Sequence, residues 1–171
     1  MNNIIILPGY SPHNKDWAID VRDNLKEKIK ETILVHEWSH WNKGSFSLKK
    51  ELDRIIIEIG KDKTDIIAKS VGVAVAMDLI PKVASQVGKV VFCGIASVEG
   101  RDREESLKNV LQVIPVKNIL CIQNENDRFV IYKDAERFYH SINPDIKVIS
   151  KPRSDHEYPF FEDFKEFLFA K

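Results

Sequence analysis

The segment from residue 64 to residue 80 constrains the fold of this chain more than any other. Thr64-Asp65-Ile66-Ile67 is short, apolar and β-branched, which predicts a buried strand. Residues 73–80 are rich in alanine and valine and too long for a strand, which predicts a buried helix. Ser70 stands between them, with Ala68 and Gly72 two residues away on either side. A strand that turns directly into a helix at a serine predicts a nucleophile elbow in an α/β fold.

The rest of the chain alternates strands and helices in the same way. Stripes of apolar side chains at helical spacing separate the predicted strands, and the chain ends in a phenylalanine-rich helix. We therefore predict one domain over residues 1–171, of the α/β class, with a roughly six-stranded parallel sheet and helices on both faces. Residues 94–117 leave room for one helix and no cap domain. The predicted strands are residues 3–7, 32–38, 64–68, 89–93, 118–123 and 146–150.

Composition excludes several other classes of protein. Twenty-six Lys and Arg residues balance 26 Asp and Glu residues, so no basic surface for nucleic acid or an anionic membrane is expected. No apolar run approaches the roughly 18 residues that span a bilayer, and the first residues are interpreted as a strand, not a signal peptide. Cys93 and Cys121 both lie in apolar strand-like runs, so we expect no disulfide framework and a cytoplasmic location.

Three side chains that could act together follow three different predicted strands. A serine hydroxyl needs a base to become a nucleophile, and His156 lies in the polar loop after the last predicted strand. Asp127 follows the strand at 118–123 and could orient that histidine, with Glu125 and Asp155 as alternative acids. Ser70 has an alternative role as the N-cap of the following helix. Because ligands bind beyond the carboxyl ends of parallel strands, we expect the three groups at one edge of the sheet.

The loop after the first strand, Pro8-Gly9-Tyr10-Ser11, is expected at the same edge. The backbone N–H groups of Tyr10 and Val71 are predicted to bind an oxyanion there. We expect further substrate contacts from Gly9, Ser11 and Phe129, and Trp17 and Trp38 are further candidates for the border of the pocket.

The order Ser70, Asp127, His156 and the Leu7-Pro8-Gly9-Tyr10 loop resemble the α/β-hydrolase family. The chain is most similar to its small lidless serine hydrolases of the retinoblastoma-binding protein 9 and YdeN type. That resemblance implies cleavage of a small ester or thioester through an acyl-enzyme, with a small acyl substrate and no cofactor. Lys69 departs from the family, which usually has His or Tyr before the serine, and could either tune the site or point to solvent.

Two other interpretations stay open at this point. An α/β-hydrolase fold can serve as a binding or interaction module, although such a module would be expected to have lost one of the three groups. His36 and His40, with Glu37 between them, could chelate a metal only if their segment were helical, and the preceding residues predict a strand. We therefore expect no metal site, and no protein partner is indicated.

Overall fold

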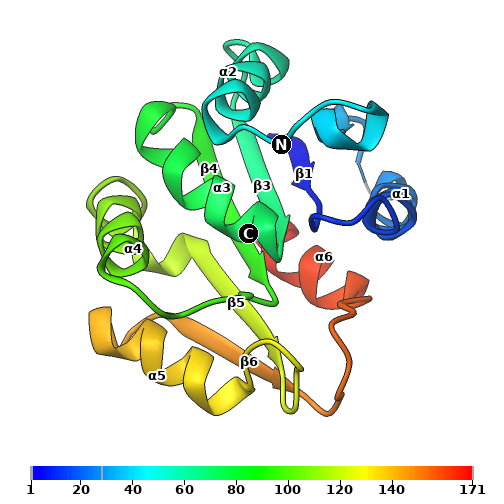
Figure 1. The fold of residues 1–171 in the computed structure, drawn as a ribbon. Helices are drawn as coiled ribbons and strands as arrows, with labels where there is room; N and C mark the ends of the chain where they lie inside the picture. Colours follow the sequence, from blue (N-terminus) through cyan, green and yellow to red (C-terminus); the bar gives the residue numbers. More distant parts are fainter. Residues whose placement is uncertain (1, 28, 171) are drawn as a thin grey trace.

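A computed structural model, which describes residues 2–27 and 29–170, has an all-parallel sheet with helices on both faces (Figure 1). The strand order in the sheet is β2-β1-β3-β4-β5-β6. The strands are β1 (Asn3–Leu7), β2 (Ile33–Val35), β3 (Thr64–Lys69), β4 (Val87–Cys93), β5 (Ile119–Asn124) and β6 (Lys147–Lys151). The helices are α1 (Asn14–Lys26), α2 (Leu48–Ile59), α3 (Val71–Leu79), α4 (Arg101–Val113), α5 (Tyr132–Ile142) and α6 (Phe161–Phe169), with short 3-10 turns η1 (Ser39–Asn42), η2 (Ile80–Lys82) and η3 (Val116–Asn118).

Each predicted strand is present, and the predicted fold class is confirmed. The largest error is in the strand predicted at 32–38, because β2 pairs with β1 only over residues 33–35. The N–H group of His36 still donates to the carbonyl of Ile6, but β1 ends one residue later, at Leu7. Pro8 then follows and has no N–H group to continue a ladder. The chain therefore leaves the sheet toward η1.

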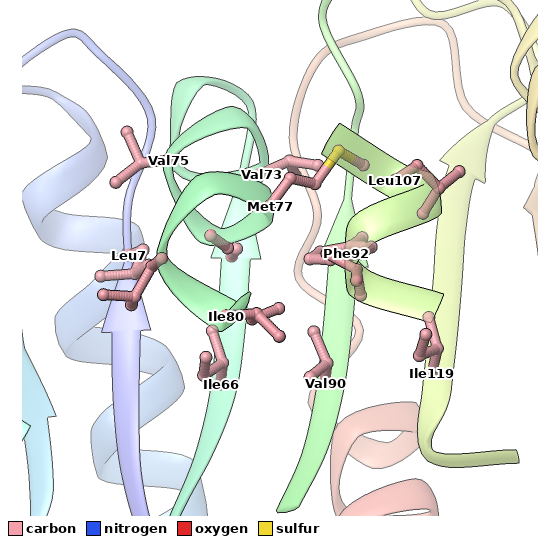
Figure 2. Close-up of a cluster of buried hydrophobic side chains, with 14 of the residues drawn as sticks. Leu7, Ile66, Val73, Val75, Met77, Ile80, Val90, Phe92, Leu107 and Ile119 are labelled. Atoms are coloured by element: carbon pink, nitrogen blue, oxygen red, sulfur yellow. The ribbon is translucent and has the colours of Figure 1, made fainter. Parts of the chain in front are cut away.

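Successive side chains of each strand point to opposite faces of the sheet, and a different layer of helices covers each face. One face packs on α1 and α6, through Ile4 and Ile6 of β1. The other face packs on α2, α3, α4 and α5, through Ile5 and Leu7 of β1. Figure 2 shows the second layer, with side chains of α3 lying over β1, β3 and β4. Because both faces are covered, the central strands carry apolar runs such as Ile4-Ile5-Ile6-Leu7 of β1 and Ile66-Ile67-Ala68 of β3, as the sequence predicts.

Close packing between α3 and β1 brings two functional loops together. A Cβ atom on Gly72 would lie 2.1 Å from the carbonyl oxygen of Leu7, so only glycine fits at this position. The sheet order changes direction around β1, which has β2 on one side and β3 on the other. In open parallel sheets ligands bind outside the carboxyl ends of strands at such a point. The loop after β1 and the turn after β3 both lie there.

Three further features of the described residues concern the segment between β4 and β5, the two cysteines and the helices. Between β4 and β5 the chain forms α4 and the short η3, so no cap domain is inserted there. Cys93 and Cys121 are free thiols in the buried core. In the described ranges no helix is both long and apolar enough to cross a bilayer.

Candidate active site

Ser70 lies at the sharp turn between β3 and α3, in a backbone conformation that L-residues rarely adopt. Its φ and ψ angles are 57° and −117°, and Lys43 is the one other described non-glycine residue with positive φ. Strain of this kind costs roughly 1–3 kcal/mol and persists only where surrounding contacts impose it. The Ser70 N–H group donates to the carbonyl of Cys93. The Ser70 side chain makes no capping hydrogen bond to α3, so its alternative role as an N-cap finds no support in the geometry.

Asp127 and His156 form a hydrogen-bonded pair, although 29 residues separate them. The distance from His156 Nδ1 to Asp127 Oδ2 is 2.6 Å, and the Asp127 residue is 2% exposed. Tyr158 donates its hydroxyl to the same Oδ2 at 2.6 Å, and the Phe129 N–H group donates to Oδ1 at 2.8 Å. Burial acts to raise the pKa of Asp127, but the hydrogen bonds from His156, Tyr158 and Phe129 outweigh it and lower the pKa overall.

The second ring nitrogen of His156 is buried without a hydrogen bond. The side chain is 10% exposed, and Nε2 has no partner among the described residues. The edge of the Phe129 ring packs against the imidazole, with ring centres 4.6 Å apart. When Nδ1 donates to the carboxylate, a neutral imidazole carries its lone pair on Nε2. The pair therefore presents a proton acceptor, and no hydrogen bond joins it to the Ser70 hydroxyl in this structure.

The two alternative acids have other partners. The Asp155 carboxylate accepts hydrogen bonds from the Arg153 guanidinium and from the Glu157 N–H group. Glu125 accepts a hydrogen bond from the Ser150 hydroxyl. Asp127 is thus the carboxylate that contacts the His156 ring.

Aromatic side chains of the η1 region hold the loop after β1. Trp38 Nε1 donates to the carbonyls of Pro8 and Gly9 at 3.2 and 3.1 Å. The Tyr10 carbonyl lies 2.6 Å from His40 Nε2 and accepts from Trp41 Nε1 at 2.7 Å. In a trans peptide the N–H group points opposite to the carbonyl, so anchoring the Gly9 carbonyl turns the Tyr10 N–H group away from Trp38. Neither the Tyr10 nor the Val71 N–H group has an acceptor within the described residues.

A cavity of about 310 Å³ lies beside Ser70. Tyr10 and Phe129 stand at its border, each 54% exposed, and a neighbouring cavity of about 440 Å³ also contacts Phe129. Gly9 and Ser11 do not line the cavity beside Ser70, and Trp17 and Trp38 are buried in the core. Its lining residues are Tyr10, Ser70, Val71, Ala74, Ile95, Ala96, Ser97, Arg103 and Phe129.

Lys69, directly before the serine, is buried with its charge. The residue is 1% exposed, so the alternative in which it points to solvent is excluded. Its ammonium donates to Asn14 Oδ1 at 2.8 Å and to Glu157 Oε2 at 2.9 Å. It also lies 5.3 Å from the centre of the Trp17 ring, within range of a cation–π contact. Lys69 thereby ties the serine turn to the start of α1 and to the histidine loop.

His36 and His40 have separate environments. Both ring nitrogens of the buried His36 face carboxylates, Glu58 at 2.8 Å and Glu51 at 3.0 Å. His40 instead stacks on the Tyr10 ring with the ring centres 4.1 Å apart. Across residues 2–27 and 29–170, no group of three or more His, Cys, Asp or Glu side chains is arranged to hold a metal ion.

Sequence reasoning missed several of these contacts. Tyr158 and Glu157 follow His156 directly, but no spacing rule connects them to Asp127 or Lys69. Trp38, which from the sequence could border the pocket or cover the core, is buried, and its indole anchors the loop after β1. The one available signal was composition, because a buried lysine or tryptophan needs a polar partner.

Comparisons with known proteins show the fold. No family model matches the chain, and no curated protein matches its sequence. Among solved structures, the ydeN gene product of B. subtilis has 14% identity and a TM-score of 0.71, with 100% of both chains covered. XC6422 of Xanthomonas campestris, described as an α/β serine hydrolase without a lid, has 13% identity and a TM-score of 0.67, with 98% of this chain and 79% of that chain covered. Est1E of Butyrivibrio proteoclasticus, also solved with ferulic acid bound, has 16% identity and a TM-score of 0.70, with 98% and 87% covered. The chain therefore has the lidless α/β-hydrolase fold, and the resemblance predicted from its motifs is confirmed at the level of the fold.

Proposed function

We propose that this protein is a serine hydrolase that cleaves small esters or thioesters through an acyl-enzyme. The observation that carries the proposal is the buried pair of Asp127 and His156, in which His156 Nε2 has no hydrogen-bond partner among the described residues. A core histidine is normally satisfied at both nitrogens, as His36 is. Nucleophilic catalysis requires an open acceptor near the serine, and Phe129, which packs against the His156 ring, also lines the cavity that contains Ser70.

In the proposed first step the Ser70 hydroxyl loses its proton to His156 Nε2 while its oxygen bonds to the substrate carbonyl carbon. Asp127 holds the ring in the correct tautomer and stabilises the imidazolium. Its lowered pKa supports this role, because the carboxylate stays ionised. The step requires Ser70 Oγ to come within hydrogen-bond distance of Nε2, a contact that often tightens only when substrate binds.

The proposed oxyanion donors are the N–H groups of Tyr10 and Val71. Both lack acceptors within the described residues, and Trp38, His40 and Trp41 brace the carbonyls of the loop that carries Tyr10. Bracing matters because such donors stabilise the transition state only when they need no reorientation.

The second half of the reaction releases the acyl group. Collapse of the tetrahedral intermediate breaks the bond from the carbonyl carbon to the leaving oxygen or sulfur, which takes the proton from His156. A water then gives a proton to His156, its oxygen bonds to the acyl carbon, and the acid leaves as Ser70 regains its proton. The proposal involves no cofactor.

A fluorophosphonate probe followed by a panel of p-nitrophenyl esters tests the proposal. We expect the wild-type protein to be labelled and Ser70→Ala to be unlabelled, with turnover reduced by several orders of magnitude. Ser154→Ala is the matched control, because this exposed serine lies in the same loop as His156. Labelling that persists in Ser70→Ala would contradict the proposed nucleophile. A folded wild-type protein that neither reacts nor hydrolyses any ester would favour a binding module.

A further inference from the structure

The cavity beside Ser70 has an uneven chemical character. Six of its nine lining residues are apolar or aromatic, and two are serines. The ninth is Arg103, in the first turn of α4, which is the one charged residue on this wall. A guanidinium beside an apolar cavity keeps five N–H donors that must be satisfied by water, by protein or by a ligand.

Arg103 differs from the other half-buried arginines of the described chain. Arg22, Arg54 and Arg153 each form an ion pair with a carboxylate. The distance is 2.8 Å from Arg22 to Asp23 and 2.7 Å from Arg54 to Glu51, and Arg153 lies within hydrogen-bond distance of Asp155. The Arg103 side chain has no hydrogen bond or ion pair with any described residue. Its neighbour Glu104 lies instead near Lys108 on the outer face of α4. No carboxylate of the described residues is therefore paired with Arg103, the one cation in the lining of this cavity.

We propose that Arg103 binds a carboxylate at the far end of the substrate's acyl chain, so that the preferred substrates are half-esters or half-thioesters of dicarboxylic acids. The inference rests on the proposed function, because it places the ester carbonyl at Ser70 and the methylene chain along the apolar wall. One guanidinium matches the single charge of a carboxylate with two parallel hydrogen bonds. A phosphate monoester carries nearly two charges, and one of them would stay uncompensated in this cavity.

Matched ester pairs test the inference. Monoethyl succinate, glutarate and adipate differ from ethyl butyrate, valerate and hexanoate only by a carboxylate in place of a terminal methyl group. For the chain length that spans the cavity, we expect kcat/KM for the half-ester to exceed that for the neutral ester by about tenfold or more, as a charge-assisted hydrogen bond allows. The acid released is titrated at constant pH.

Three variants separate recognition from general electrostatics. Arg103→Met should abolish the preference for half-esters, so that kcat/KM for each half-ester falls to that for its neutral partner. A urea unfolding transition like that of the wild type shows that the variant folds. Arg103→Lys should keep part of the preference, since it keeps the charge and loses the fork geometry. Arg101→Met is the matched control, because it removes the same charge from an exposed position two residues earlier on α4 and does not line the cavity. Its preference should stay within about twofold of wild type, as expected for a screened charge.

A binding measurement decides the inference independently of turnover. In the Ser70→Ala background, calorimetry should show that monoethyl adipate or glutarate binds more tightly than its neutral partner, and that Arg103→Met removes the difference. Equal affinity for both members of every pair, or a preference that survives in Arg103→Met, would overturn the inference. Tighter binding of ethyl phosphate than of every half-ester would also overturn it. Absence of turnover with intact Arg103-dependent binding would count against the proposed function and support the anion site.

Discussion

Because Lys69 is buried and Glu157 is partly exposed, we expect removal of Glu157 to destabilise the fold more than removal of Lys69. Lys69→Met removes the ammonium and fills its space with an apolar chain, and Glu157, whose side chain is 42% exposed, turns to water. Replacing a charge in this way is often close to neutral, so we expect a loss of at most about 1 kcal/mol in the free energy of unfolding. The expected loss of at most about 1 kcal/mol includes the hydrogen bond that Asn14 no longer accepts from Lys69.

Glu157→Gln has the opposite consequence, since it leaves the ammonium of the 1%-exposed Lys69 in the core without its carboxylate. Breaking a fully buried pair costs roughly 3–5 kcal/mol, and the exposure of Glu157 reduces the expected loss to about 2–3 kcal/mol. Combining the two substitutions should cost no more than Lys69→Met alone. The two changes therefore couple by roughly 2 kcal/mol.

Urea unfolding at pH 7, followed by tryptophan fluorescence, measures all three variants. Glu104→Gln is the control, because its contact with Lys108 is exposed and 3.8 Å long and should contribute less than about 0.5 kcal/mol. A larger loss in Lys69→Met than in Glu157→Gln, or a double variant whose loss is the sum of the two, would refute this account of the buried charge.

Three further predictions concern contacts around the candidate site. Tyr158→Phe should lower the free energy of unfolding by about 1–3 kcal/mol in chemical denaturation, because the buried Asn124 N–H group loses its acceptor and Asp127 loses a donor. Because the pKa of Asp127 is lower in the folded than in the unfolded state, its carboxylate stabilises the fold above the unfolded pKa near 4, and this stabilisation is lost as the pH falls through the folded pKa. The stability advantage of wild type over Asp127→Asn should therefore shrink between about pH 5 and pH 2. A difference that stays constant over this range would contradict the assigned pKa shift. Gly72→Ala should lower the melting temperature, with a cost of at least about 1–3 kcal/mol, because its Cβ would meet the Leu7 carbonyl; an unchanged melting temperature would refute the close approach.

Much of the fold could be predicted because its signals are local. Short Ile/Val runs and apolar helical stripes mark elements without knowledge of their neighbours, and strand β1 was predicted to the residue at 3–7. The end of β2 was predicted wrongly at residue 38, because a strand ends where its partner ends, and the ladder partner of β2 is β1. The predicted position of Asp127 and His156 at one sheet edge followed from parallel topology, and the contact between them is present.

The order of elements and the chemical groups that follow each strand can be predicted from the sequence alone, since both depend on residue type and spacing along one chain. The tertiary structure decided which of those groups are buried, paired or left open. Lys69 and His36 are charged or titratable residues inside apolar surroundings, and only the folding of distant segments brings them their carboxylates. Among the described residues, His156 Nε2 and the Arg103 guanidinium have no such partner, and no spacing rule along the chain specifies what a distant loop places beside them.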